Sequence, residues 1–357
     1  MGCSAAALSR NCICSQLSEL FWLCFRRRLP SIHPGLSSPQ GENILVPEMF
    51  EPEKGVYIAF EAVIAVLAIL GNVLVIWVVK LNPAFQKTTF YFVISLALAD
   101  IGVGLVMPVA IVVSLEIQIS YYACLFMCCQ LMIFTQASIL SLLAIAIDRY
   151  LRLRLLTRYR MKSSQKKICG ALAAIWLLSL LVGFGPFGWA QAKPENSDVM
   201  NCTFTNVIKM EYMIYMSFFA GTLVPLIVMC ILYAKIFCLI RTKLQPCSMN
   251  VNGQRSFYRQ EFRTAKSLAL VLFLFAVCWL PLCILNCINH FSPGNIPQHV
   301  TYMGILLTHS NSVMNPIVYT FRIKKFRETC IQILRTYIVH KDPEDATSPS
   351  ATTSEHS

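Results

Sequence analysis

Seven long apolar stretches constrain this chain more than any other feature of its sequence. They lie at approximately 56–79, 90–114, 124–147, 168–189, 212–240, 264–288 and 300–321. The hydrocarbon core of a bilayer is about 30 Å thick, so a helix of roughly 20 mostly apolar residues can span it. Backbone amides in lipid must be paired within the segment, and these runs lack the two-residue alternation of barrel strands. The sequence therefore predicts an all-α membrane protein, a bundle of seven transmembrane helices.

Composition excludes the soluble classes and offers no catalytic set. Hydrophobic residues make up 56% of the 357 residues and charged residues only 13%, about half the share in a soluble domain. The 16 cysteines show no repeated CxxC pairs of the kind that zinc sites need. We find no Ser/His/Asp or Cys/His set, no phosphate-binding glycine loop and no metal cluster. A protein that is not an enzyme is therefore expected.

The distribution of cations predicts the orientation in the membrane. Of the 30 Lys and Arg, 23 lie in alternate loops and the C-terminal segment, at 80–87, 149–167, 235–266 and 322–357. The three loops between them hold only Lys193 and Lys209. Because Lys and Arg of short loops stay in the cytoplasm, we expect the N-terminus outside and the C-terminus inside. The net charge of +12 then reflects topology and not nucleic-acid binding.

The chain divides into three predicted parts. Residues 1–55 form an extracellular tail, 56–321 the membrane domain, and 322–357 a cytoplasmic segment. The last begins with a short amphipathic helix and ends in a Ser- and Thr-rich tail that we expect to be disordered. Because Met49 opens a remainder that holds every span, we interpret 1–48 as an alternative or mispredicted extension.

Several polar, aromatic and proline residues stand at characteristic positions within the spans or at their ends. Asp148-Arg149-Tyr150 follows the third span, and Asn315-Pro316-Ile317-Val318-Tyr319 ends the seventh. The other spans carry Asn72, Asp100, Trp176, Pro225, Trp279 and Pro281. In this order the set resembles the rhodopsin-like G-protein-coupled receptors over residues 56 to about 337. The resemblance implies a receptor that acts on heterotrimeric G proteins, with arrestin and receptor kinases as further partners.

The resemblance also implies an activation switch at the cytoplasmic end. Its residues would be Asp148, Arg149, Tyr150, Glu261, Tyr233, Tyr319 and Pro281. At rest Arg149 would be held by Asp148 and Glu261. On activation the two tyrosines would swing toward the arginine as the sixth helix moves outward around its proline. The alternative is that the charges only anchor helix ends at the interface.

Asp100 is an acid in the middle of the second span, where an unpaired carboxylate is costly. The resemblance implies that it forms a sodium pocket with Ser138, Asn311 and Asn315, beneath Trp279. Carboxylate, hydroxyl and amide oxygens are ligands that hard cations accept. A protonated Asp100 bonded to Asn315 is the alternative, and no other cofactor is expected.

Three modifications follow from cysteines and a sequon. The resemblance implies a disulfide between Cys124, at the outer end of the third span, and Cys202, in the second outer loop. That bridge would hold Phe204 over the mouth of the bundle. Asn201-Cys202-Thr203 is a glycosylation sequon whose middle residue is the bridging cysteine. Cys330, on the amphipathic helix, is a candidate palmitoylation site.

Two residue types that other receptors need for their ligands are absent from the expected positions. Residues 124–137 contain no acid to pair with an amine, and 300–321 contain no lysine for a retinal Schiff base. A neutral, polar and partly flat ligand fits better. Local sequences are similar to those of the adenosine receptors at 72–77, 96–100, 279–282, 286–288 and 308–311.

That resemblance implies an adenosine pocket with a defined set of residues. They are Leu131, Thr135, Phe204, Met210, Trp279, Leu282, Asn286, Ile305, Thr308 and His309. Asn286 would pair with the adenine edge through its amide. Phe204 would stack its ring on the adenine base. Thr135, Thr308 and His309 would reach the ribose. Glu61 would fix the tautomer of His309 from behind.

Some positions depart from the adenosine-receptor pattern. Thr205 and Cys283 stand where several subtypes have an acid and a histidine, which favours the third subtype. Gln136 matches the other subtypes, and Pro108 lies one residue closer to Asp100 than expected. The third subtype implies plasma-membrane signalling through inhibitory G proteins that lowers cyclic AMP. A receptor for another small neutral ligand, or a seven-helix transporter or channel, remains the alternative.

Overall fold

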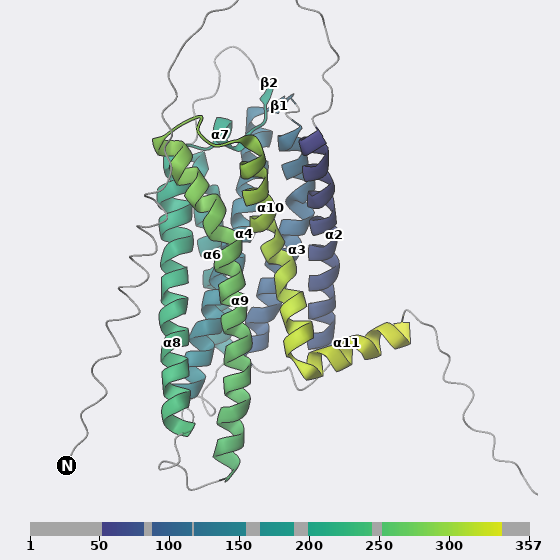
Figure 1. Ribbon diagram of the computed structural model, residues 1–357, viewed down its shortest axis with the longest axis vertical. Helices are drawn as coiled ribbons and strands as arrows, with labels where there is room; N and C mark the ends of the chain where they lie inside the picture. Colours follow the sequence, from purple (N-terminus) through teal and green to yellow (C-terminus); the bar gives the residue numbers. More distant parts are fainter. Residues whose placement is uncertain are drawn as a thin grey trace, which may run out of the picture. The chain divides into compact units, whose positions relative to one another are not determined.

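The computed structural model describes residues 52–81, 88–115, 118–154, 165–188, 199–244 and 252–337, so the interpretation of 1–48 lies outside it. Long helices run roughly side by side in this part of the chain (Figure 1). They are α2 (Pro52–Leu81), α3 (Thr88–Ser114), α4 (Tyr121–Arg154), α6 (Gln165–Phe184), η3 (Tyr212–Leu223) continued by α8 (Val224–Leu244), α9 (Asn252–Phe291) and α10 (Gln298–Arg322).

The helix α10 differs from the others in composition. Six of the described helices are long and apolar enough to cross a membrane, and α10 is not among them. Its polar side chains are buried, namely those of Thr308, His309, Asn311, Ser312 and Asn315. A helix that turns hydrogen-bonding side chains toward the bundle interior has lower hydropathy but needs no contact with water. The α10 helix is thus the seventh member of the bundle, as the sequence predicts.

Contacts between the helices close a ring. The order α2, α3, α4, α8, α9, α10 and back to α2 follows closely packed neighbours, and α6 packs against α4. A large apolar cluster fills the half of the bundle near α11 (Lys324–Tyr337), with Leu96, Ile139, Ile236 and Phe275 almost fully buried. The α4 helix packs against three other long helices, namely α3, α6 and α8. Its side chains therefore face the bundle interior along most of its length.

The end of the bundle opposite α11 carries structure that the seven spans did not predict. Two short antiparallel strands, β1 (Gln118–Ser120) and β2 (Val199–Asn201), pair with Ile119 opposite Met200 (Figure 1). A short turn of 3-10 helix, η2 (Gly185–Phe187), and the helix α7 (Phe204–Val207) lie in the same region of the sequence. Two three-residue strands have no periodicity that a sequence reading could detect.

The fifth spanning segment begins with wide helical turns, in which the N–H of Val224 bonds to the carbonyl of Phe219, five residues back. Pro225 has no N–H, so the carbonyl of Gly221 lacks its α-helical donor. The Nε2 of Gln136, from α4, donates to that carbonyl at 3.2 Å. Gln136, which the sequence marked only as a subtype difference, therefore joins α4 to η3.

A final helix, α11 (Lys324–Tyr337), leaves the end of α10 at a sharp angle (Figure 1). Phe326, Cys330 and Ile333 are buried in the main apolar cluster, while Lys324, Arg327 and most intervening positions are exposed. Residues at i, i+4 and i+7 share one face of a helix. The amphipathic helix predicted after the seventh span is confirmed.

Candidate functional site

The predicted disulfide is present and shapes the end of the bundle where α2 begins. Cys124, in the first turn of α4, is bonded to Cys202, with a Cα–Cα distance of 5.7 Å, and both side chains are fully buried. Cys202 directly follows β2, and Phe204 opens α7 two residues later. The bridge and the two strands together hold this loop against α4. Asn201 of the sequon is exposed, beside the buried Cys202.

The predicted pocket residues come from α4, α9, α10 and the loop after β2. Most are partly buried, which is typical of side chains around an interior space; these are Leu131, Thr135, Phe204, Met210, Trp279, Leu282, Asn286 and Ile305. Thr308 and His309 are buried. Across the part of the chain that is described, no hydrogen bond engages the Asn286 side chain, so its amide donor and acceptor are available.

Close contacts join α9 to α10 at this level. Thr308 Oγ1 lies 2.9 Å from the carbonyl of Gly304 and 3.3 Å from the carbonyl of Cys278, so its hydroxyl proton is engaged by backbone oxygens. A methyl group at Gly304 would lie within 3.3 Å of Leu282. The missing side chain therefore lets Leu282 approach α10. Thr308 can still accept a hydrogen bond from a ligand hydroxyl.

A buried acid stands behind the predicted ribose-binding residues. Nδ1 of His309 lies 2.8 Å from Oε1 and 3.0 Å from Oε2 of Glu61, which is fully buried in α2. The contact engages Nδ1, so Nε2 is the nitrogen that remains for a ligand. Tyr57, one turn earlier in α2, also interacts with Glu61. The structure thus brings together the pair that the resemblance implied.

A polar cluster surrounds Asp100 in the middle of the bundle. Ser138 Oγ donates to its Oδ1 at 3.1 Å and Asn315 Nδ2 to its Oδ2 at 2.7 Å. Ser312, which the sequence reading missed, also contacts this carboxylate. Asn311 is buried, but among the described contacts no hydrogen bond joins it to Asp100.

This donor set fits a hard cation. Among the described residues, Oδ1 of Asn315 is buried with no hydrogen-bond partner, and it belongs to the side chain that already contacts Asp100. An unused amide oxygen beside a carboxylate and the Ser138 hydroxyl is the ligand chemistry that hard cations prefer. The alternative of a protonated Asp100 is also compatible with the bond to Asn315. The residues therefore fit sodium without requiring it.

At the opposite end, a buried ion pair joins α4 to α9. Arg149 Nη1 lies 3.3 Å from Glu261 Oε2, and both side chains are almost fully buried. Asp148 contacts Thr89 Oγ1, and its Oδ2 lies 3.5 Å from Arg152 Nη2. Arg152 is four residues after Asp148, a spacing that could have revealed the pair in the sequence. Thr89 comes from α3, and no sequence signal pointed to it.

Other predicted switch residues lie around this ion pair. Tyr233 and Tyr319 are 6% and 4% exposed. The hydroxyl of Tyr319 and Nε of Arg149 are buried with no hydrogen-bond partner in the described part of the chain. Buried polar groups are rarely left unpaired unless their partners change or water reaches them. Tyr150 points elsewhere, since its hydroxyl accepts a bond of 3.1 Å from the exposed Arg154.

The structure also shows where Pro281 and Cys330, two further predicted residues, lie in their helices. Pro281 lies inside α9, two residues after Trp279, whose Nε1 is buried with no described hydrogen-bond partner. Cys330 is 4% exposed on the inner face of α11, and burial raises the pKa of its thiol above the ordinary value. Thiolate chemistry at Cys330 is therefore suppressed in this conformation.

Comparison with known proteins identifies the family. The sequence profile described as "7 transmembrane receptor (rhodopsin family)" matches residues 71–319. The chain is 55% identical to the adenosine receptor A3 of Ovis aries over 299 residues, which covers 82% of this chain and 94% of the relative. It is 56% identical to the adenosine receptor A3 of Canis lupus familiaris, over 79% of this chain and 92% of the relative. The protein of the same name from Bos taurus is 55% identical over 82% of this chain and 94% of the relative. The chain is a multi-pass membrane protein that belongs to the rhodopsin family of seven-transmembrane receptors and, within it, to the adenosine receptors, which are not enzymes.

Proposed function

We propose that this receptor binds adenosine and responds by activating an inhibitory heterotrimeric G protein, which lowers cyclic AMP. The observation that carries the proposal is the identity of 55–56% to three receptors named adenosine receptor A3. The buried Glu61–His309 contact and the unengaged amide of Asn286 support it from the structure. They supply hydrogen-bonding groups of the types that a nucleoside needs.

In the proposed complex the base and the sugar are bound by different helices. Asn286 pairs with the adenine edge, because one amide offers both a donor and an acceptor. Phe204 stacks on the base, and Met210, Leu282, Ile305 and Leu131 close its apolar sides above Trp279. Thr135, Thr308 and Nε2 of His309 bind the ribose hydroxyls. Glu61 positions His309 without touching the ligand.

The proposed orientation places α7 and the disulfide outside the cell. The helix ends that adjoin the segments rich in Lys and Arg lie at the other end, as expected for the cytoplasmic face of a plasma-membrane protein. A disulfide is also stable in the oxidising extracellular space. This orientation exposes Asn201 to glycosylation and Arg149 to the G protein, with arrestin and receptor kinases as further cytoplasmic partners. Acylation of Cys330 would require its buried side chain to turn outward.

Ligand binding would act on the inner end through a change of partners. In the resting state Arg149 is paired with Glu261, and sodium held by Asp100, Ser138, Asn311 and Asn315 favours this state. In the active state α9 moves outward around Pro281 and Arg149 leaves Glu261. Tyr233 and Tyr319 then become new partners of Arg149. Within the described residues the buried Tyr319 hydroxyl has no hydrogen-bond partner, so it is available for this contact.

The test compares Asn286→Ala with Asn206→Ala, an exposed asparagine outside the proposed pocket. A bidentate amide–adenine contact contributes about 1–3 kcal/mol, so Asn286→Ala should weaken adenosine binding roughly five- to 150-fold. Asn206→Ala should not change it. Competition against a radiolabelled adenosine analogue measures affinity, and cyclic AMP with and without blockade of inhibitory G proteins measures coupling. Unchanged binding by Asn286→Ala would exclude the proposed pocket, and adenosine-driven ion flux without nucleotide exchange would indicate a transporter or channel.

A further inference from the structure

The buried carboxylate of Asp148 is held by side chains other than that of its neighbour Arg149. Thr89 Oγ1, from the first turn of α3, donates to Asp148 Oδ2, and Arg152 Nη2 lies 3.5 Å from the same oxygen. Arg152 Nη2 also donates to Thr89 Oγ1 at 3.0 Å. Each of these side chains therefore contacts the other two, and together they fasten the end of α4 to the start of α3.

Arg149 is paired with a different acid. Its Nη1 lies 3.3 Å from Glu261 Oε2 of α9, and within the described residues no hydrogen bond or ion pair joins it to Asp148. Helical spacing explains the division, because Arg152 follows Asp148 by four residues and shares its face, whereas adjacent residues do not face each other. The direct restraint on Arg149 in this conformation therefore comes from Glu261.

The contact between Arg152 and Asp148 differs from an exposed surface pair. The side chain of Asp148 is 2% exposed and that of Arg152 is 17% exposed, and Thr89 is 1% exposed. Water screens charges poorly at such positions, so the attraction is stronger than in exposed pairs, which contribute little. A carboxylate removed from water also needs hydrogen bonds from protein groups. Thr89 and Arg152 supply two such donors.

Arg152 also acts on Arg149 through its charge. The guanidinium of Arg149 is affected electrostatically by the negative charge of Asp148 and by the positive charge of Arg152. Like charges repel, so Arg152 opposes the approach of Arg149 to Asp148 while its own contact occupies that acid. Arg149 has a donor for a second acid, because its Nε is buried with no hydrogen-bond partner in the described part of the chain. Without Arg152, Asp148 would therefore attract Arg149.

We propose that Arg152, together with Thr89, keeps Asp148 from pairing with Arg149, and that Arg152 is thereby a positioning residue that limits how firmly the resting state is held. Release of Arg149 then requires the loss of one ion pair, to Glu261 on the moving helix α9, and not of two. This inference rests on the proposed function, in which that release activates the receptor. The contacts that carry it do not involve the ligand.

The experiment measures the position of α9 in the purified full chain, in nanodiscs without ligand or G protein. Arg263, exposed on α9, is replaced by para-trifluoromethyl-phenylalanine, and fluorine NMR resolves the resting and active populations. Glu261→Gln provides a background in which the active population is raised. Arg152→Ala in that background should lower the ratio of active to resting receptor roughly tenfold, because a charge-assisted contact between Asp148 and Arg149 replaces the lost one.

Three further variants in the same background separate charge from packing. Arg152→Lys keeps the positive charge and should leave the ratio close to that of Glu261→Gln alone. Thr89→Val keeps the shape of the side chain without the hydroxyl, so it should shift the ratio in the direction of Arg152→Ala, but less. Arg154→Ala removes an exposed arginine from the same end of α4 and should leave the ratio unchanged.

Ligand affinity gives a second measurement that involves no contact with a G protein. Adenosine competition against a labelled neutral antagonist should weaken in Arg152→Ala, while the affinity of the antagonist stays unchanged, because only the agonist distinguishes the active from the resting receptor. An unaltered receptor that binds no adenosine would refute the proposed function, and the fluorine spectra would still decide the role of Arg152.

Two results would overturn the role of Arg152. One is a ratio of active to resting receptor in Arg152→Ala that equals or exceeds the ratio in Arg154→Ala. The other is an equal fall in Arg152→Lys, which would show that the shape of the side chain and not its charge is responsible. Thermal unfolding monitors the folding of each variant. If Arg152→Ala does not fold, Thr89→Val carries the test, and a ratio equal to that of Arg154→Ala would then overturn the proposal.

Discussion

His309 Nδ1 lies 2.8 Å from Glu61 Oε1, which ties α10 to α2 across 248 positions of sequence. Glu61 is fully buried and His309 is 7% exposed. Each of these polar groups would be costly in this environment without the other. The pair therefore fixes His309 in one wall of the proposed pocket and leaves Nε2 as the ring nitrogen that can contact a ligand.

Removal of the acid should weaken agonist binding without removing a ligand contact. Glu61→Ala removes the partner that orients His309, so its ring can turn away and leave a ligand hydroxyl unpaired in the complex, at a cost of about 1–3 kcal/mol. We expect roughly five- to 150-fold weaker adenosine binding in radioligand competition. Glu61→Gln, which keeps a hydrogen-bonding oxygen, should lose less. Equal affinities for Glu61→Ala and the unaltered receptor would show that the pair does not position the histidine.

The Arg149–Glu261 ion pair should restrain activity in the absence of ligand. Glu261→Gln weakens a charge-assisted contact worth about 1.5 kcal/mol or more, so basal nucleotide exchange on the G protein should rise roughly tenfold. The control is Glu328→Gln, in the exposed Lys324–Glu328 pair at 3.6 Å. Exposed pairs contribute little, so this variant should behave as the unaltered receptor. Basal exchange that stays low in Glu261→Gln would contradict a restraining role.

Sodium dependence should require Asp100. If sodium favours the resting state, replacing choline chloride with sodium chloride should weaken agonist binding, and Asp100→Asn should abolish that difference. The control is Ser95→Ala, which removes one partner of the buried Ser95–Ser141 contact at 3.0 Å. It should leave the sodium effect intact. Agonist competition curves in the two salts give the answer, and a sodium effect that persists in Asp100→Asn would remove the ion site.

The bond from Gln136 to Gly221 should matter only because Pro225 lacks an N–H. Gln136→Leu leaves a buried carbonyl without a donor, at a cost of about 1–3 kcal/mol, and should lower the unfolding temperature of the purified receptor. Pro225→Ala restores a backbone donor, so Gln136→Leu should be less harmful in that background. Additive effects of the two substitutions, measured as a double-mutant cycle, would argue against this explanation.

Cys128 should be able to replace Cys124 in the disulfide. The sulfur atoms of Cys124, Cys128 and Cys202 all lie within 4.8 Å of one another. In Cys124→Ser we therefore expect a Cys128–Cys202 bridge, detectable by peptide mapping under non-reducing conditions. Cell-surface expression should fall further in Cys124→Ser/Cys128→Ser, because loss of a native disulfide typically costs about 2–5 kcal/mol. Equal expression of the single and double variants would exclude the replacement.

The sequence by itself was sufficient for the spans, for the family and, through the family resemblance, for the disulfide. Length and apolarity determine whether a segment can cross a bilayer, and these are local properties of the chain. Residues such as Asp148, Arg149, Asn315 and Pro316 belong to motifs that can be recognised without coordinates. The amphipathic helix α11 was predicted for the same reason, because its apolar face repeats at helical spacing.

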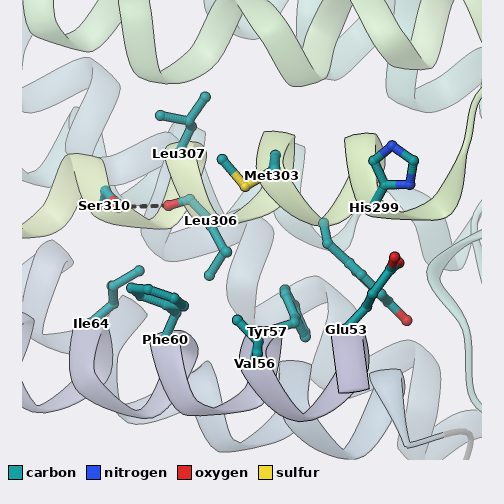
Figure 2. A pocket seen from close by; sticks show the side chains of 11 residues that line it. Glu53, Val56, Tyr57, Phe60, Ile64, His299, Met303, Leu306, Leu307 and Ser310 are labelled. Carbon is teal, nitrogen blue, oxygen red and sulfur yellow. Dashed lines mark hydrogen bonds between the residues drawn. The ribbon is translucent and has the colours of Figure 1, made fainter. Parts of the chain in front are cut away.

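Only the tertiary structure determined which polar groups meet. The contacts of Thr89 with Asp148, of Ser312 with Asp100 and of Gln136 with Gly221 join different helices. Such contacts depend on the rotation and depth of each helix in the bundle, and the periodicity of one helix does not specify these relative to another. A groove between α2 and α10, about 660 Å³ in volume and lined by side chains of both helices (Figure 2), is decided in the same way, because its volume arises from how the two helices pack and not from either sequence alone.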